Sequence, residues 1–345
     1  MALSSKASPP TITDVAAQAG VSIKTVSRVM NQEPGVHPQT REQVLKVVAA
    51  LKYRPKLSAR SLAGARSFLI GLLYYDPSAA FVGGVQQGAT LRCREAGYHL
   101  VVESLHDDAP DLRQQVDRMV SALQPDGMIL TPPLCDDPEI LELLRANRTP
   151  CVLISPGTEG HGMAAVRMDD TLAAEELTNL LISLGHKDIA FIEGNQSASG
   201  RRRAGYERAL KAHRIPVDRQ LIVPGNFQFE AGVAAAQALF ASAKPPTAIF
   251  AANDDMALGA LTAAQRLGIA VPHDVAIVGF DDSRAATLVW PELSTVRQPL
   301  AEMAMAAVDM LLAGAAKPGE APPVRVLPHE VVVRGSTAAP AKGRA

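Results

Sequence analysis

Short apolar runs of strand character recur along the chain from Phe68 onward, and this repetition constrains the fold more than any other feature. The runs are FLIGLLYY, HLVVES, GMILTPP, CVLISP, IAFIEG, LIVPG, TAIFAAN and VAIVGF. Amphipathic stretches such as FVGGVQQGATLRCREAG and ALGALTAAQRLG lie between most of them. Strands that alternate with helices predict parallel sheets with helices on both faces. The runs are too many for one ordinary sheet, so the pattern predicts two similar α/β lobes, with ligands bound beyond the carboxyl ends of the strands.

The residues before Phe68 lack such runs and predict short helices. TDVAAQAG predicts a helix with Thr13 as its N-cap and Gly20 at its end. After a tight turn, Ser22 caps a second helix over IKTVSRVM, and Thr40 opens a third over TREQVLKVVAALKY. Two helices joined by a short turn and braced by a third are typical of a helix-turn-helix domain.

The second of these helices has a buried side and a polar side. Its buried stripe comprises Val26, Val29 and Met30. Its outer side, near the N-terminal half, carries Ile23, Lys24, Ser27 and Arg28. A recognition helix presents such residues to base edges in the major groove, where an arginine can donate two hydrogen bonds to guanine. The pattern therefore predicts a helix that reads DNA, and the alternative is a solvated helix in an ordinary bundle.

Charge is distributed unevenly along the chain, whose formal net charge is −1. Residues 1–66 hold ten Lys and Arg against three Asp and Glu, about +7, so the remainder carries about −8. A basic head on an acidic body predicts a polyanion-binding module. The hydroxyl and amide groups of this head that suit phosphate contacts are those of Ser22, Thr25 and Asn31.

Several protein classes are excluded by what the sequence lacks. No run approaches the length that spans a bilayer, and the N-terminal MALSSKASPPTITD has no long apolar stretch of a secretory signal. Cys93, Cys135 and Cys151 match no metal-ligand or redox spacing. The chain has no G-x-S-x-G elbow, Walker loop, G-x-G-x-x-G motif or metal-ligand cluster. These absences predict a cytoplasmic protein that is not an enzyme, has no membrane partner and needs no cofactor.

Two N-terminal segments resemble the signature of the lactose-repressor (LacI/GalR) family of bacterial transcription regulators: TITDVAAQAGVSIKTVSRVMN and ALKYRPKLSARSLAG. Three later segments resemble the effector domain of the same family: ANDDMALG, VAIVGFDD and LSTVRQP. The resemblance covers nearly the whole chain. It implies an α-helical N-terminal helix-turn-helix domain, followed by a two-lobed α/β effector domain like the periplasmic binding proteins.

The resemblance also implies domain boundaries. They are 1–53 for the DNA-binding domain, 54–66 for a hinge, 67–338 for the effector-binding and dimerisation domain, and 339–345 for a tail. The N-lobe of the effector domain would span about 67–168 and 298–327, and its C-lobe about 169–297 and 328–338.

The resemblance also implies DNA contacts for several residues. Family members read bases in the major groove at the positions of Ile23, Lys24 and Arg28. Leu62 matches the leucine that the family's hinge helix inserts into the minor groove, a wedge that kinks the duplex. The residues expected to contact phosphates are Thr11, Ser22, Thr25 and Asn31. The segment RPKLSARSLAGARS, otherwise a flexible linker, would then become ordered on operator DNA.

Three loops that follow predicted strands carry groups suited to a hydroxyl-rich ligand: Arg202, Asn253 and Asp281. By resemblance these match effector contacts, and Phe227 matches an aromatic residue that packs on the ligand. The chain departs from the family at Ser155, where many sugar-responsive members have an aspartate. The loop after the first strand adds three candidate effector contacts: Tyr75, Asp76 and Ser78. Trp290 is expected to pack against the protein rather than to stack on a ligand.

Taken together, these features predict a homodimeric repressor of a carbohydrate-utilisation operon. It would bind double-stranded operator DNA and be released by a small-molecule effector, a sugar. Three alternatives stay open. The effector could be a nucleobase or a sugar phosphate, or it could act as a corepressor; the chain could also be a small-molecule binding protein without a DNA function. The basic head and the missing signal argue against the last of these.

Overall fold

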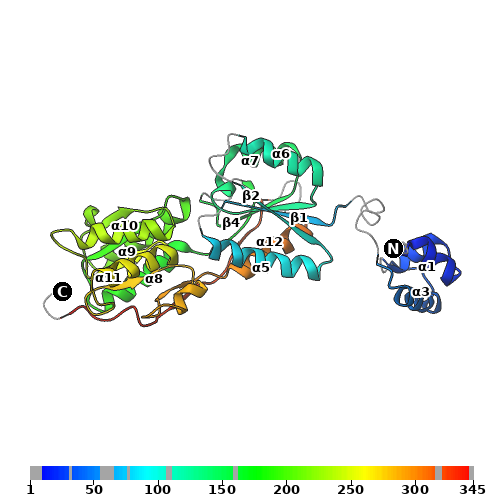
Figure 1. The fold of residues 1–345 in the computed structure, drawn as a ribbon. Coiled ribbons are helices and arrows are strands. Elements are labelled where there is room, and N and C mark those ends of the chain that lie inside the picture. The colour runs from blue at the N-terminus through cyan, green and yellow to red at the C-terminus, as the bar shows by residue number, and fades with distance from the viewer. Residues whose placement is uncertain are drawn as a thin grey trace, which may run out of the picture. The chain divides into compact units, whose positions relative to one another are not determined.

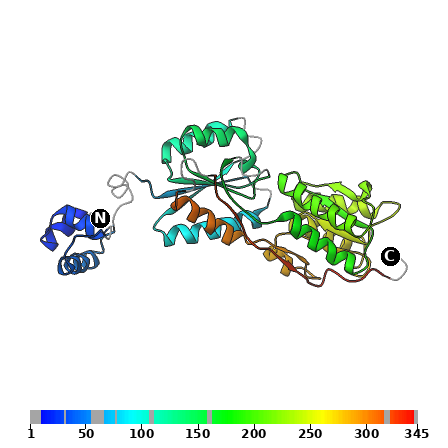
Figure 2. The same cartoon turned by 180° about the vertical axis from the view of Figure 1, so that it is seen from behind.

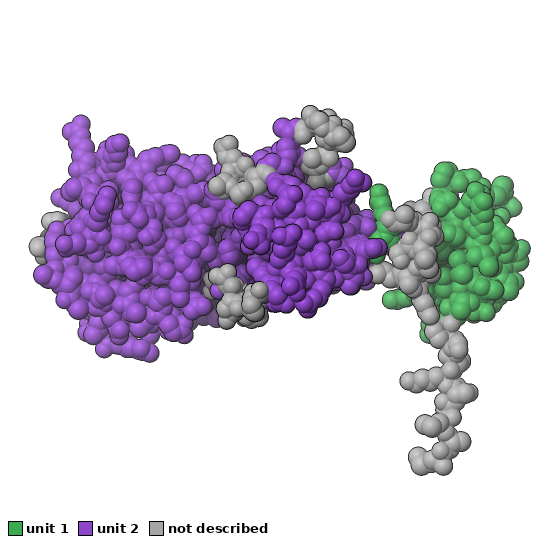
Figure 3. Space-filling view, turned by 90° about the horizontal axis from the view of Figure 1, so that it is seen from above, with its two compact units in different colours: residues 1–67 green, residues 68–345 purple. Residues whose placement is uncertain are grey.

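A three-helix unit and a larger α/β unit make up the chain. The computed structural model describes residues 10–30, 33–54, 66–75, 78–105, 111–157, 162–314 and 321–341. These residues fall into two units, Met1–Ser67 and Phe68–Ala345, which Figure 3 colours separately. Three residues with a predicted role, Asn31, Leu62 and Asp76, lie outside the described residues.

Unit 1 contains α1 (Ile12–Ala19), α2 (Ile23–Met30) and α3 (Pro38–Ala50). Their apolar faces meet in one small core, formed by Val15, Ala16, Ala19, Val26, Val29, Val44 and Tyr53. The turn between α1 and α2 begins at Gly20, whose φ of 64° is the left-handed conformation that glycine adopts without strain.

Two predicted helix starts are wrong, the first by two residues and the second by three. The N-cap of α1 is Thr11 and not Thr13, because the Thr11 side chain accepts from the Asp14 backbone while the Asp14 carboxylate accepts from the Thr11 backbone. Similarly, α3 is preceded by His37 rather than by Thr40. Its first residue is Pro38, whose fixed φ suits the first turn of a helix.

The first lobe of unit 2, called the N-lobe from here on, is built on a six-stranded sheet in which all neighbours are parallel. The strands, in spatial order, are β11 (Val324–Val326), β5 (Ala164–Arg167), β4 (Cys151–Ile154), β3 (Gly127–Leu130), β1 (Leu69–Tyr75) and β2 (His99–Leu105). Every residue of β3 and β4 is buried, as expected for strands that are covered on both faces.

Helices cover both faces of this sheet (Figure 1). On one face α5 (Ala79–Glu95) packs beside α12 (Leu300–Leu312). On the other lie α6 (Leu112–Leu123), the short 3-10 helix η1 (Leu134–Asp136) and α7 (Pro138–Ala146). Figure 2 shows the same two layers from behind, with α5 and α12 again side by side.

The second lobe, the C-lobe, has a four-stranded parallel sheet. Its strands, in spatial order, are β7 (Ile222–Pro224), β6 (Ile189–Glu193), β8 (Ala248–Ala251) and β9 (Ala276–Val278). Its helices are α8 (Asp170–Ser183), α9 (Ser197–Ala212), α10 (Phe229–Phe240) and α11 (Asp254–Arg266), with two 3-10 helices, η3 (Arg219–Leu221) and η4 (Arg284–Thr287). The helices pack in pairs, α8 with α9 and α10 with α11.

The chain crosses between the lobes three times. It passes from β5 into α8, from the C-lobe through β10 (Thr295–Arg297) into α12, and from β11 through β12 (Glu330–Val332) back to the C-lobe. The two later crossings pair as antiparallel strands. This arrangement sets the carboxyl ends of several strands from both lobes near one another. Among the described residues, no helix is both long and apolar enough to cross a membrane.

Candidate functional site

Helix α2 presents the residues that the sequence analysis assigned to DNA bases. Ile23 is 48% exposed and Lys24 and Arg28 are also exposed, whereas Val26 and Val29 are buried. The Arg28 side chain lies 3.8 Å from the Glu33 carboxylate, and both side chains are about half exposed. An exposed ion pair at this distance contributes little to stability, so Arg28 can exchange Glu33 for a nucleic acid.

The start of α2 is capped by its own hydroxyl groups. The Ser22 hydroxyl accepts from the Thr25 backbone N–H at 3.1 Å and lies 2.9 Å from the Thr25 hydroxyl. The Thr11 hydroxyl is likewise engaged with Asp14. These three predicted phosphate contacts therefore also hold the helix starts, which fixes their positions on the surface.

Two side chains of α3 hold the ends of the other helices, a feature that the sequence analysis did not identify. Gln43 donates its amide to the Ala19 carbonyl at 2.9 Å, at the end of α1. Arg41 donates to the Val29 carbonyl at 3.4 Å and to the Glu33 carbonyl at 2.7 Å, at the end of α2. Since the last carbonyls of a helix lack partners inside it, these bonds fix α1 and α2 relative to α3.

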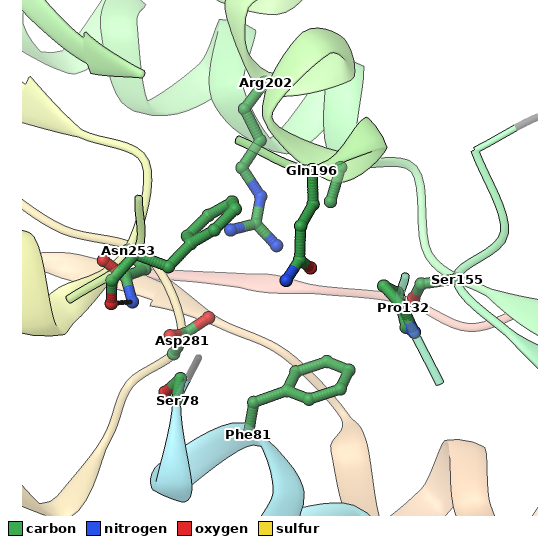
Figure 4. A pocket seen from close by; sticks show the side chains of 10 residues that line it. Ser78, Phe81, Pro132, Ser155, Gln196, Arg202, Asn253 and Asp281 are labelled. Atoms are coloured by element: carbon green, nitrogen blue, oxygen red, sulfur yellow. Dashed lines mark hydrogen bonds between the residues drawn. The ribbon is translucent and has the colours of Figure 1, made fainter. Parts of the chain in front are cut away.

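A pocket in unit 2 encloses about 470 Å³ of empty space, part of it open to solvent. The N-lobe contributes Ser78, Phe81, Pro132 and Ser155, and the C-lobe contributes Gln196, Ala198, Arg202, Phe227, Asn253 and Asp281 (Figure 4). Six of these ten residues lie within three residues of the ends of strands β1, β3, β4, β6, β8 and β9. The pocket therefore lies beyond the carboxyl ends of the strands, where parallel sheets bind their ligands.

The structure brings together six of the eight residues that the sequence analysis assigned to the effector: Ser78, Ser155, Arg202, Phe227, Asn253 and Asp281. Tyr75 is not brought to the pocket; it ends β1 and packs, partly buried, against the N-lobe core. Asp76 lies outside the described residues.

Trp290 does not pack, contrary to the prediction. Its side chain is 84% exposed, and neither the pocket lining nor the cores of the described residues include it. It follows η4 on the surface of the C-lobe, where its backbone carbonyl accepts a hydrogen bond from Gln265.

Four lining residues were missed: Phe81, Pro132, Gln196 and Ala198. Gln196 follows β6, and Pro132 follows β3. The rule that ligands bind at strand ends could therefore have found both, but the sequence analysis assigned only Arg202 after β6 and no residue after β3. Phe81 and Ala198 lie in the first turns of α5 and α9, where nothing in the sequence distinguishes them from core residues.

Arg202 enters the pocket from α9 with most of its guanidinium already engaged. Its Nε donates to Asp170 Oδ1 at 3.1 Å and its Nη1 to the Ala252 carbonyl at 2.5 Å. Its Cζ lies 3.8 Å from the centre of the Phe280 ring, a cation–π contact. Within the described part of the chain Nη2 donates no hydrogen bond, so this group is available to a ligand.

Asn253 positions Phe227 in addition to lining the pocket. Its side-chain oxygen accepts from the Met256 backbone and caps α11, while its Nδ2 donates to the Phe227 carbonyl at 2.9 Å. Gly194 makes room for the ring, because a Cβ atom at Gly194 would lie 2.2 Å from it. The hydrogen bond thus holds the Phe227 backbone, and the absence of a side chain at Gly194 leaves space for its ring.

Asp281 is buried opposite Arg202. Burial raises the pKa of Asp281 well above its usual value, the Arg202 guanidinium lowers it, and the Asp254 carboxylate raises it further. Gln298 donates to the Asp281 Oδ1 at 2.5 Å. The carboxyl group is therefore held in place by a residue of the second crossing, between β10 and α12, as well as by its own loop.

Three lining residues have backbone conformations that L-residues seldom adopt. The φ angles of Ser155, Phe227 and Asp281 are 51°, 68° and 138°. Such strain is commonly found at ligand sites, where surrounding structure enforces it. The strained backbone directs these three side chains to the pocket, whereas a relaxed backbone would direct them elsewhere.

Three polar atoms in the lining are buried and have no hydrogen-bond partner among the described residues: Ser78 Oγ, Ser155 Oγ and Gln196 Nε2. Buried polar groups in proteins are nearly always paired. Two hydroxyls and an amide, in a lining that also includes the rings of Phe81 and Phe227, would be satisfied by a ligand with several hydroxyl groups and an apolar face.

Two family models match the chain. The model of bacterial regulatory proteins, lacI family, matches residues 11–56, which include the three helices of unit 1. The model of the periplasmic binding protein-like domain matches residues 178–337.

Characterised relatives are similar over almost their whole length. The chain is 33% identical to catabolite control protein A of Priestia megaterium, over 95% of this chain and 99% of that protein. It is 35% identical to the HTH-type transcriptional regulator DegA of Bacillus subtilis, over 95% and 98%. Its identity to the ribose operon repressor of Haemophilus influenzae is 33%, over 94% and 98%.

Solved structures match as well. A complex of the transcriptional regulator CelR with cellobiose matches with a TM-score of 0.71 at 31% identity, over 95% of this chain and 99% of that one. A lac repressor dimer bound to operator and an anti-inducer matches with a TM-score of 0.81 at 28% identity, over 96% and 100%. These matches confirm the predicted fold class, a helix-turn-helix domain followed by a two-lobed α/β domain.

Proposed function

The chain belongs to the lacI family of bacterial regulatory proteins, and from this premise we propose a specific regulatory function for it. As a member of that family it is a DNA-binding transcription regulator and not an enzyme. The proposed function is repression of a carbohydrate-utilisation operon in the cytoplasm, relieved when a neutral sugar occupies the pocket of unit 2.

The observation that carries the sugar proposal is a lining that combines two aromatic rings with three polar atoms that have no hydrogen-bond partner among the described residues. Ser78, Ser155 and Gln196 offer hydrogen bonds, and Phe81 and Phe227 offer apolar surface. Sugar rings combine hydroxyl groups with C–H faces. The name of the ribose operon repressor and the cellobiose complex of CelR support a carbohydrate.

Electrostatics favour a neutral sugar over a sugar phosphate. Arg202 is the single cation among the described lining residues, and its Nε already donates to the Asp170 carboxylate at 3.1 Å. Asp281 contributes an acidic group on the opposite side. Phosphate recognition needs cationic donors that are free for the ligand, and this lining supplies a buried carboxyl group instead.

On the DNA side, Ile23, Lys24 and Arg28 are proposed to read bases from the exposed face of α2. Ser22, Thr25 and Thr11 would contact phosphates, as would Asn31, and Leu62 would act as the minor-groove wedge. A homodimer would place one α2 in each half of a pseudo-palindromic operator. The lac repressor structure, a dimer on its operator, supports this arrangement.

The test is fluorescence anisotropy of the protein on a labelled duplex from its own upstream region, at constant salt because salt strongly sets such affinities. D-ribose, D-glucose and cellobiose are compared with ribose 5-phosphate and glucose 6-phosphate. Release by a neutral sugar and not by its phosphate is the expected result. Release by a phosphate would refute the neutral class, tighter binding would indicate a corepressor, and no sequence-specific binding would refute the operator proposal.

A matched pair of variants connects this response to the pocket. Gln196→Ala removes an unpartnered lining amide, whereas Gln220→Ala removes an exposed amide elsewhere on the C-lobe. We expect the first to raise the sugar concentration for half-release and the second to leave it unchanged. Equal responses of the two variants would place the effector elsewhere.

A further inference from the structure

Three consecutive arginines in α9 have three different environments. Arg202 enters the pocket, as described above. Arg203 forms ion pairs with Glu193 at 3.2 Å and Glu207 at 2.7 Å, both inside the C-lobe. Arg201 does not line the pocket, and its contacts are not confined to the C-lobe. It has no role in the proposed function.

Arg201 reaches out of the C-lobe to the backbone of the N-lobe. Its Nη1 donates to the Pro156 carbonyl at 2.7 Å, and its Nη2 donates to the Ser155 carbonyl at 3.2 Å. Ser155 and Pro156 directly follow β4 of the N-lobe sheet, whereas Arg201 lies in α9 of the C-lobe. Two parallel donors on one rigid guanidinium thus join the two lobes.

The same guanidinium is anchored on its own side by a buried carboxylate. Arg201 Nε and Nη2 donate to Asp170 Oδ2 at 3.3 and 3.2 Å. The other oxygen of Asp170 accepts from Arg202, the arginine that lines the pocket. The Asp170 side chain is 1% exposed, so both pairs are shielded from water.

At the far end of these contacts lies a strained pocket residue. Ser155 has a φ of 51°, its backbone N–H donates to Val166, and its hydroxyl is buried at the pocket without a partner among the described residues. A non-glycine residue in this conformation needs support from its surroundings. The bond from Arg201 to its carbonyl supplies such support.

The lobes are also in close contact beside Arg201. Asp136 of the N-lobe accepts from the Ser197 hydroxyl of the C-lobe at 2.7 Å and from the Gly157 backbone at 2.7 Å. A Cβ atom at Gly157 would lie 2.3 Å from that of Ser197. The Ser155–Gly157 segment is therefore in close contact with the C-lobe, so a change in lobe spacing would alter these contacts.

We propose that Arg201 is a positioning residue that clamps the Ser155–Pro156 segment of the N-lobe to α9 of the C-lobe. The clamp sets the spacing of the lobes and holds the Ser155 hydroxyl at the pocket. Through Asp170 it is also joined to Arg202. The idea that Ser155 contacts an effector rests on the proposed function, whereas the clamp itself does not.

The experiment measures lobe spacing without DNA or sugar. Ser121→Cys on α6 and Ala238→Cys on α10 place spin labels at exposed positions in the two lobes, and the native cysteines are buried. Double electron–electron resonance, with labelled chains diluted in unlabelled protein, gives the distance distribution within one chain. We expect Arg201→Met to lengthen the mean distance and to broaden the distribution relative to the parent.

Arg203→Met is the matched control, because it removes the same side chain and two ion pairs from the same helix without touching the N-lobe. It should leave the distribution unchanged. Equal changes in both variants, or none in either, would overturn the proposal. Arg201→Lys keeps a cation beside Asp170 but cannot donate to two carbonyls in parallel. It should fall between parent and Met variant, and a parent-like distribution would also refute the clamp.

The distance measurement tests the clamp independently of the proposed function. A protein that ignores every sugar of the panel can still lose its lobe spacing when Arg201 is replaced. Conversely, a sugar-responsive protein with an unchanged distance distribution would keep the proposed function and refute the clamp.

Discussion

At the scale of the residue, neighbours in sequence serve different purposes because an α-helix turns by about 100° per residue. Arg201 contacts the other lobe, Arg202 the pocket and Arg203 the surface of its own lobe. Three identical side chains thus differ only in direction. The chemistry of each follows from the carboxylate or carbonyl that the fold places opposite it.

The buried carboxyl group of Asp281 makes stability depend on pH. Burial raises its pKa, with Arg202 opposing, so the folded state holds the proton more tightly than the unfolded state. The contribution of this group to the free energy of unfolding therefore falls as pH rises above the usual aspartate range. We expect Asp281→Asn to raise the unfolding midpoint at about pH 7, with a smaller difference near about pH 4.

Thermal unfolding of parent and variant across this pH range measures the effect. In anisotropy we expect the variant to keep operator binding and to lose the sugar response. A variant that is less stable than the parent at neutral pH would contradict the assignment of a raised pKa.

Arg28 is expected to read a base. Arg28→Ala should weaken operator binding by about 1–3 kcal/mol and relax the preference at one base pair. The measurement is anisotropy on operators that carry each base at each position. Lys46→Ala is the comparison, since Lys46 is an exposed cation of α3 paired with Glu42; it should not change base preference. An Arg28 variant that weakens all duplexes alike would make Arg28 a phosphate contact instead.

At the scale of the element, caps and glycines decide where helices begin and how closely segments approach. Helix α1 starts at a capping box, α1 and α2 end on side chains of α3, and β6 leads into α9 through a glycine that lies against Phe227. None of these devices buries much area. Each one satisfies a backbone group or removes a clash at a single point.

The N-cap of α1 can be tested with two threonines of the same turn. Thr11→Ala removes the cap and should destabilise α1 by about 1 kcal/mol, whereas Thr13→Ala replaces an exposed helical residue by a better helix former. Hydrogen exchange of the α1 amides in the full chain measures both. Loss of protection in the Thr13 variant alone would show that the helix starts where the sequence analysis placed it.

Gly194 is expected to be required for the position of the Phe227 ring. Gly194→Ala places a methyl group 2.2 Å from the ring and should cost about 1–3 kcal/mol of stability or displace the ring from the pocket. Gly200→Ala is the control, because a Cβ atom at Gly200 meets nothing within 4 Å. Unfolding midpoints and the sugar concentration for half-release report the two effects. A Gly194 variant that matches the Gly200 variant in both would show that the ring does not need this space.

At the scale of the whole molecule, the pocket belongs to neither lobe alone. Ser78, Phe81, Pro132 and Ser155 come from one sheet and its loops, and the remaining six lining residues come from the other. A ligand that contacts both sets favours one lobe spacing over others, which is how occupancy can be coupled to a separate DNA-binding unit. The same coupling accounts for three features of the pocket region. They are the strained backbone of lining residues, the hydroxyl groups without a hydrogen-bond partner among the described residues, and the arginine that contacts both lobes.

Much of the architecture is encoded in short-range patterns. Strand and helix periodicity predicted parallel sheets and two lobes, Gly20 and Ser22 marked the turn of the helix-turn-helix, and apolar spacing separated the two sides of α2. These signals lie within a few residues of one another, so they need no knowledge of the rest of the chain. Strand ends likewise pointed to Arg202, Asn253 and Asp281, although resemblance to a known family was needed to choose among the candidates in each loop.

Other features depend on residues far apart in the chain and became visible only in three dimensions. Arg201 lies 45 residues from Pro156, and Ser197 lies 61 residues from Asp136. Tyr75, at the end of β1, packs against a core, whereas Trp290, after η4, lies on the surface. Periodicity reports which side of an element is apolar, but packing decides which partner that side meets. The clamp, the caps from α3 and the backbone strain at the pocket are therefore properties of the packed chain, because each needs two distant segments to occupy the same space.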